Sequence, residues 1–244
     1  MTRKFIIGIG GIMTAIALSP LFAAFEAHVI NVTAKIENAL NVHPEALEFG
    51  TVFPQEHLDS SFFISFSQSF SAQDQRRVST VRYLLKQKPK PRPDKIDSLG
   101  GLEKARDWCH TNAPADVGDV NDPYYQNCYP NICPYLSKHP DNNPSTGANA
   151  NNDIGLPPFH DPEKEFARGK MVKFKNGNTI NNDPADMWTV DLAVPCFRGM
   201  CAQDWEKFVT DLNPNADPDK YPLDPRLEHQ TFGCDIWVEV TKVF

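Results

Sequence analysis

The sequence predicts an all-β fold, a jelly-roll-like antiparallel β-sandwich that carries a long insertion of loops and helices. Apolar and polar residues alternate in several separate segments, as they do in strands that bury one face. Strand patterns occur near both ends of the chain, after the first 23 residues and at the C-terminus. Apolar residues at the spacing of a helix occur in only two short stretches. With 244 residues, one large domain with a full hydrophobic core is feasible.

The chain begins with the pattern of a secretory signal peptide. Two basic residues precede an apolar run from Phe5 to Leu18 that is too short to favour a membrane-spanning helix. Pro20 ends this run, and the small residues after it favour cleavage by signal peptidase between Ala23 and Ala24. We therefore expect residues 1–23 to be removed, and the mature protein to be secreted, extracellular or at the cell surface, with no membrane partner.

The mature chain is expected to start as a strand. Residues 28–36 alternate between two faces and are rich in β-branched side chains. One face carries His28, Ile30, Val32, Ala34 and Ile36. A strand at a processed N-terminus can pair with its own domain or be donated to the open sheet edge of a neighbour. The alternation fits both arrangements, so both stay open at this point.

Segment 24–88 is expected to supply the first strands of the sandwich. Leu47–Pro54 predicts a short strand that ends at its proline. The clearest alternation runs over Phe62–Phe70, with Phe and Ile on one face and mostly Ser on the other. Val78–Lys88 repeats the pattern, so these two segments predict either a hairpin or a pair that crosses between the sheets. The inward residues of the second segment are expected to be Val81, Tyr83 and Leu85.

The middle of the chain has a different composition. Residues 89–186 are rich in Pro, Asn, Asp and Gly, which predicts a disulfide-tied insertion rather than a simple connection. A helix is expected within it at Leu102–Cys109.

The C-terminal segment, 187–244, is expected to return to the same sandwich. Alternation predicts strands at Met187–Val194 and Cys234–Phe244. Between them, apolar residues at three- and four-residue spacing predict a short amphipathic helix from Ala202 to Asp211.

Six cysteines in an exported chain predict disulfides rather than metal ligands. Three lie in the middle of the chain and three near its end: Cys109, Cys128 and Cys133, then Cys196, Cys201 and Cys234. Because each group is odd in number, either one bridge joins the groups or some thiols stay free. Fifteen complete pairings are possible, and the spacing does not choose among them.

The charge of the chain argues against nucleic acid as a partner. The formal charge of -7 becomes about -9 once the two basic residues of the signal are removed. Phosphate binding needs a concentrated basic face. The basic stretch Arg82–Lys95 is interrupted by prolines, which is typical of a solvated linker.

No catalytic constellation and no required cofactor are predicted, because zinc-protease, nucleophile-elbow and phosphate-loop motifs are absent from the sequence. Two acidic segments are weak candidates for calcium. The first has oxygen-bearing side chains at every second position: Asp211, Asn213, Asn215, Asp217 and Asp219. It lacks the glycine and the final glutamate of an EF-hand loop, so a turn rich in Pro and Asp is the preferred interpretation. The second comprises Asp116, Asp119, Asn121 and Asp122.

Three features together resemble the TasA/camelysin family of exported biofilm-fibre proteins. They are the junction Leu21–Glu26, the strand that follows it, and Phe49–Glu56 leading into the Phe62–Phe70 alternation. The likeness covers the N-terminal strands and, more loosely, the last strands. The long insertion and the six cysteines depart from the familiar members.

The resemblance implies a dedicated signal peptidase and a mature N-terminus made of a small residue followed by Phe, here Ala24 and Phe25. It also implies a jelly roll whose N-terminal strand, here Ala24–Ile36, is donated to the next subunit of a filament.

The leading hypothesis is therefore a non-enzymatic subunit of a cell-surface or biofilm-matrix fibre. Its partners would be further copies of itself in a head-to-tail polymer, whose heterologous contacts need not close. One alternative is a monomeric secreted surface-binding module that contacts its ligand through Trp108, Tyr124 and Tyr125. The other is a camelysin-type metalloprotease, for which the sequence has no matching zinc motif.

Overall fold

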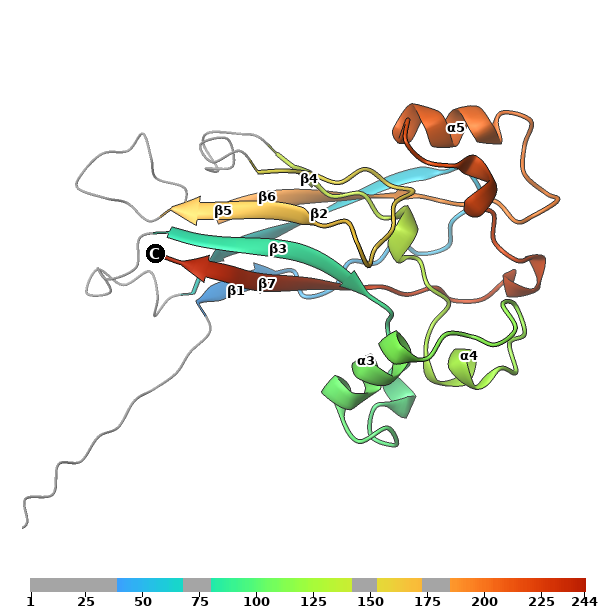
Figure 1. Cartoon of the computed structure of the whole chain (residues 1–244), viewed down its shortest axis with the longest axis horizontal. Coiled ribbons are helices and arrows are strands. Elements are labelled where there is room, and N and C mark those ends of the chain that lie inside the picture. The colour runs from blue at the N-terminus through green and yellow to red at the C-terminus, as the bar shows by residue number, and fades with distance from the viewer. Residues whose placement is uncertain (1–38, 68–79, 142–152, 173–184) are drawn as a thin grey trace, which may run out of the picture. The chain divides into compact units, whose positions relative to one another are not determined.

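The computed structural model describes residues 39–67, 80–141, 153–172 and 185–244, and they belong to one structural unit of the chain, Asn38–Phe244. These residues form two antiparallel sheets with helices and loops at one end (Figure 1). The predicted signal peptide, its cleavage site and the predicted strand at residues 28–36 lie outside the described residues. None of the described helices is long and apolar enough to cross a membrane.

The first sheet has the strand order β1-β2-β6-β4, and every neighbouring pair in it is antiparallel. Its strands are β1 (Leu40–His43), β2 (His57–Phe66), β4 (His139–Pro140) and β6 (Ala185–Ala193). The second sheet has the order β5-β3-β7 and is also antiparallel throughout. Its strands are β3 (Thr80–Lys88), β5 (Ala167–Val172) and β7 (Asp235–Val243).

The helices lie outside the two sheets (Figure 1). The α-helices are α3 (Leu102–Thr111), α4 (Pro123–Asn127) and α5 (Trp205–Leu212). Four short 3-10 turns complete the described elements: η2 (Pro93–Lys95), η3 (Cys133–Tyr135), η6 (Pro218–Lys220) and η7 (Pro225–Leu227). The chain therefore has the two-layer arrangement of a β-sandwich, with its helices in the connections.

The core lies between the sheets and follows the predicted alternation. The buried residues of its central strands are Phe62, Ile64, Phe66, Val81, Tyr83, Leu85, Trp188, Val190 and Leu192. Tyr83 is the member of this set that carries a hydroxyl, which donates to Asp186 and accepts a 2.8 Å hydrogen bond from the Trp188 indole. Burial, and then the negative charge of Asp186, raises the pKa of Tyr83 well above its usual value. The hydroxyl is therefore satisfied inside an otherwise apolar layer.

Most predicted elements are present, and β2 and β3 form the crossing pair because they lie in different sheets. The predicted strand at Leu47–Pro54 is wrong, because this segment has no strand pairing. Gly50 adopts a φ of 70°, which takes the backbone out of the β region in the middle of the segment. The short strand β1 precedes it and was not predicted.

The segment 89–186 contributes to both sheets. β4 pairs with β6 in the first sheet, and β5 pairs with β3 in the second. These parts of the predicted insertion therefore belong to the sandwich itself, while α3 and α4 lie outside it.

All six cysteines form disulfides, and the bridge between the two groups is Cys133–Cys234. Cys109–Cys128 joins α3 to the end of α4, and Cys196–Cys201 closes a small loop before α5. Cys234 immediately precedes β7, so the long-range bridge attaches the last strand to η3. Three disulfides fit an oxidising environment such as the extracellular one.

The disulfides that close the largest and the smallest loop test this arrangement. Replacing Cys133 and Cys234 by Ala releases a loop of 101 residues, which is expected to cost about 4.7 kcal/mol of unfolding free energy. Replacing Cys196 and Cys201 by Ala releases a loop of 5 residues, with an expected cost of about 2 kcal/mol. Guanidinium unfolding without reductant measures both. Cys133 and Cys196 are both fully buried, so equal losses would contradict the loop-entropy argument.

Candidate functional site

One edge of the sandwich is closed by a short segment that pairs with both sheets. Leu156 exchanges two 2.8 Å backbone hydrogen bonds with Lys138, beside the first sheet. Ile154 exchanges two 2.9 Å bonds with Arg168 of β5 in the second sheet. Between them, a Cβ atom on Gly155 would lie only 2.7 Å from the carbonyl oxygen of Lys138. Glycine therefore permits the close approach, and residues 153–156 with β4 and β5 form the closed edge.

The opposite edge lacks such a cover among the described residues. Because β4 and β5 lie at the closed edge, the strand orders place β1 and β7 together at the other side. We call β1 and β7 the open edge. β7 pairs with β3 along one side, and no described strand pairs with its other side. It is nine residues long, so its outer side presents a row of backbone donors and acceptors.

The side chains of β7 also show that its inner face is incompletely covered. Val240 lies opposite Tyr83, and Val243 lies opposite Val81, so each valine faces the core side of the sheet. Val240 is 41% exposed and Val243 is 45% exposed, whereas Tyr83 and Val81 are 1% and 0% exposed. At the closed edge, by contrast, Met171 of β5 is fully buried. The open edge therefore leaves core-facing apolar surface in contact with solvent.

The open edge carries features that limit indiscriminate pairing. A bulge interrupts the register of β7 with β3 between Arg82 and Tyr83. The cationic groups of Arg82 and Lys242 lie 5.2 Å and 4.5 Å from the centre of the Phe244 ring, at the end of the strand. Bulges and lysines at sheet edges oppose unspecific association. These features therefore disfavour unspecific pairing of other strands with β7.

The structure does not bring the first calcium candidate together. Asn213 is buried and donates to the carbonyl oxygens of Pro158 and Phe159. Asp211 pairs with Lys207, and Asp217 accepts from the backbone N–H of Asp219. The backbone N–H of Asn215 donates to Asn213. Across the described ranges, no group of three or more His, Cys, Asp or Glu side chains could hold a metal ion.

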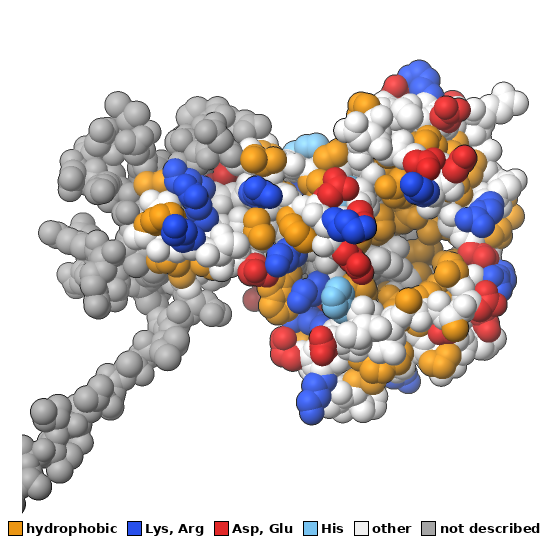
Figure 2. Space-filling view, in the orientation of Figure 1, with side chains coloured by type: hydrophobic (Ala, Val, Ile, Leu, Met, Phe, Trp, Pro, Cys, Tyr) orange, Lys and Arg blue, Asp and Glu red, His pale blue; other side chains and the backbone are white. Residues whose placement is uncertain are grey.

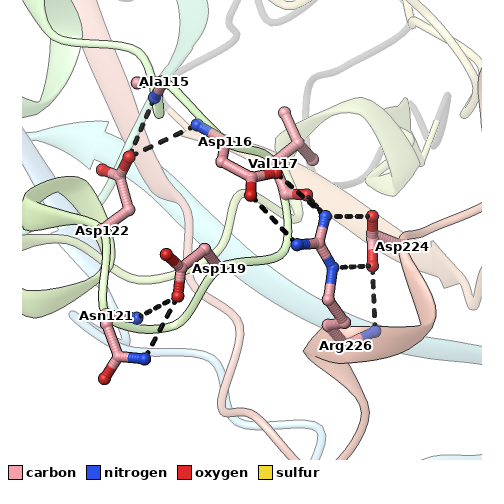
Figure 3. Close-up of polar contacts among 8 residues, drawn as sticks. All are labelled: Ala115, Asp116, Val117, Asp119, Asn121, Asp122, Asp224 and Arg226. Carbon is pink, nitrogen blue, oxygen red and sulfur yellow. Dashed lines mark hydrogen bonds and ion pairs between the residues drawn. The ribbon is translucent and has the colours of Figure 1, made fainter.

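The second acidic segment forms an arginine-centred clamp (Figure 3). The guanidinium of Arg226 binds both carboxylate oxygens of Asp116 at 3.1 and 3.0 Å, and both of Asp224 at 3.0 Å. These hydrogen bonds lower the pKa of Asp224 to about 2. Asp122 instead caps α4, and Asp119 accepts from Asn121. The positive charge among these carboxylates is thus supplied by the protein, and the clamp joins the loop before α4 to η7.

The aromatic residues proposed for the binding-module alternative are not a surface group. Tyr124 and Tyr125 are each 6% exposed and pack with the Cys109–Cys128 bridge in a small second core. Trp108 is partly buried against the same cluster. They therefore stabilise the α3 and α4 region.

A buried polar group lies beside the closed edge. His160 contacts Gln87 through Nε2 at 2.7 Å and the carbonyl oxygen of Pro157 through Nδ1 at 2.9 Å. Lys138 is fully buried, and its Nζ donates to the carbonyl oxygen of Leu136 at 3.2 Å. Burial lowers the pKa of Lys138 to about 7, and burial together with Lys138 lowers the pKa of His160 to about 3. Within the described residues no nucleophilic side chain contacts His160, so the group serves to satisfy buried backbone carbonyls.

Replacing Lys138 by Met tests this burial. Between pH about 7 and 10.5 the unfolded chain binds the lysine proton and the folded chain does not, so wild-type stability rises with pH across this window. The unfolding free energy of Lys138→Met minus that of the wild type is therefore expected to fall by on the order of 3 kcal/mol from pH 7 to pH 10. Urea unfolding at both pH values measures it, and a pH-independent difference would contradict a buried, neutral lysine.

Amide hydrogen exchange on the monomer tests the open edge. Amides of β3 lie between two strands and are expected to exchange only on large-scale opening, whereas alternate amides of β7 face outward and are expected to exchange much faster. β5 provides the comparison, because Ile154 covers part of its outer side. Uniform slow exchange along β7 in the monomer would show that another segment of the same chain already pairs with it.

No family model, no curated protein and no solved structure matches this chain. The resemblance to TasA and camelysin stays a prediction from the sequence.

Proposed function

We propose that the protein is a structural subunit of an extracellular fibre, in which the N-terminal strand of one copy docks on the open edge of the next. The observation that carries this proposal is the exposure of Val240 and Val243 on the core side of an edge strand. An apolar surface that faces a core and yet contacts water lacks one covering element. A donated strand supplies both the missing backbone partners and the missing side chains.

The predicted donor strand has the right length and pattern for this role. Residues 28–36 span nine positions, and β7 also has nine residues. One face of the segment carries Ile30, Val32 and Ile36, which can cover the half-buried and exposed valines of the open edge. Each β-branched side chain that becomes fully buried contributes about 1.5–3 kcal/mol. Several such contacts are enough to hold a subunit interface together.

The direction of the chain supports donation to a neighbour. The start of β1 and the carboxyl end of β7 lie at the same end of the two sheets (Figure 1). The segment that precedes β1 in the sequence joins the domain at this end, where a second copy can present its own β7. Donor and acceptor are different surfaces, so the contact is heterologous and repeats without closing.

A single substitution at the open edge tests the acceptor. Val240→Lys places a charge where the donated strand must pack, and is expected to abolish filaments of the mature chain starting at Ala24. Negative-stain electron microscopy at rising protein concentration measures it. Val120→Lys is the matched control, because Val120 is 40% exposed in a loop and Val240 is 41% exposed. Filaments of Val240→Lys at the wild-type concentration would overturn β7 as the acceptor.

Deletion of residues 24–36 tests the donor. The shortened chain is expected to stay monomeric, and to bind a synthetic peptide of residues 24–36 with a gain in thermal stability. A peptide with the same composition in scrambled order is the control. Filaments formed by the shortened chain, or equal binding of both peptides, would contradict strand donation.

A further inference from the structure

A pocket lies between α3 and the start of β7, away from the valines of the open edge. It encloses about 310 Å³ and is lined by Lys88, Glu103, Lys104, Arg106, Asp107, His110 and Trp237. Figure 2 shows basic and acidic side chains and a histidine gathered on the visible face where α3 lies beside the strands. The pocket therefore combines one aromatic wall with charged groups of both signs.

The aromatic wall is held in place before any ligand arrives. The ammonium group of Lys88 lies 4.3 Å from the centre of the Trp237 ring, and the guanidinium carbon of Arg106 lies 5.3 Å from it. Arg106 is fixed in turn by a 2.9 Å hydrogen bond from its Nε to Asp235, whose side chain is only 16% exposed. Cation–π contacts and a charge-assisted hydrogen bond thus order the three side chains.

Several charged groups of the pocket have no strong partner. Among the described residues, Lys88 and Lys104 form no ion pair, and neither does Asp107. Glu103 is 78% exposed and reaches Arg106 only at 3.5 Å. Because a surface ion pair of this length contributes little, Glu103 is available to a ligand, and Lys88, Lys104 and Asp107 have no described ion pair to give up. The pocket offers cations for a carboxylate, and carboxylates and a histidine for hydroxyl groups.

We propose that this pocket binds a saccharide that carries a carboxylate, such as a uronic acid residue. The carboxylate pairs with Lys88 and Lys104 at the basic side. Sugar hydroxyls donate to Asp107 and Glu103, while the apolar C–H groups of the ring lie along Trp237 and the methylene stems of the basic residues. A neutral sugar leaves the lysines unpaired, and a bare anion makes no use of the acidic side. This inference does not depend on the fibre proposal.

The test uses the mature chain with its disulfides intact and isothermal titration calorimetry. The probe is a hexamer of galacturonic acid, compared with a neutral galactose hexamer and with inorganic sulfate. The double variant Lys88→Gln, Lys104→Gln is expected to weaken binding of the acidic hexamer at least about tenfold. Lys86→Gln is the matched control, because Lys86 lies on the same strand as Lys88 but pairs with Glu239 at 2.7 Å outside the pocket.

The outcomes separate the possible ligands. Binding of the acidic hexamer that is lost in the double variant and kept in Lys86→Gln supports the proposal. Equal binding of the neutral hexamer overturns the requirement for a carboxylate. Sulfate binding as tight as that of the acidic hexamer overturns the saccharide in favour of a bare anion, and unchanged binding by the double variant overturns the pocket.

Discussion

The need of sheet edges for backbone partners is the constraint on which this structure depends. A two-layer sandwich has edges on both sides, and each exposes N–H and C=O groups. Residues 153–156 satisfy one side by pairing with Lys138 beside the first sheet and with β5 in the second. Among the described residues no segment covers the other side in this way, and β7 is the longer of the two strands there. The two sides of the sandwich therefore differ: one edge has its backbone groups paired, and the other leaves the outer side of β7 without a described partner.

Burial follows the same asymmetry. β5 at the closed edge buries alternate residues completely, whereas β1 and β7 at the open edge have no fully buried residue. Leu40 and Val42 of β1, and Ile236 and Val238 of β7, pack against the core only partly. The core is therefore complete at its centre and at one side, and it thins toward the other.

Alternation was a good guide where the buried side chains are large. Large apolar or aromatic side chains are buried at every second position over residues 62–66 of β2, 81–85 of β3 and 188–192 of β6, and all three strands were expected from the sequence. β5 was missed because its buried positions include Ala167 and Gly169, which are too small to give a hydrophobic signal. A Cβ on Gly169 would lie 2.2 Å from the Tyr83 side chain, so the space is filled from the neighbouring strand. That Tyr83 fills the space beside Gly169 is visible only in the packed structure.

Among the polar sites, some have a local signal in the sequence and others depend on the fold. The disulfide pairing required the fold, because Cys133 and Cys234 are 101 residues apart. The acidic residues carry a local signal for a different role, since Asp122, Asp217 and Asp224 each precede a proline and each accepts from a backbone N–H as the cap of a short helix. An Asp-Pro pair is typical of such a cap. The pocket around Trp237 combines residues from β3, α3 and β7, so no local sequence pattern predicts it.

The Cys133–Cys234 bridge also has a mechanical meaning. In the proposed fibre, tension would pass through β7, and hydrogen bonds to β3 are the only described backbone pairing that resists removal of this strand. Cys234 lies at the amino end of β7, so the covalent bond passes the load from the strand to η3. A pull on a strand docked to β7 would therefore load the proposed subunit interface before it could remove the amino end of β7 from its own domain.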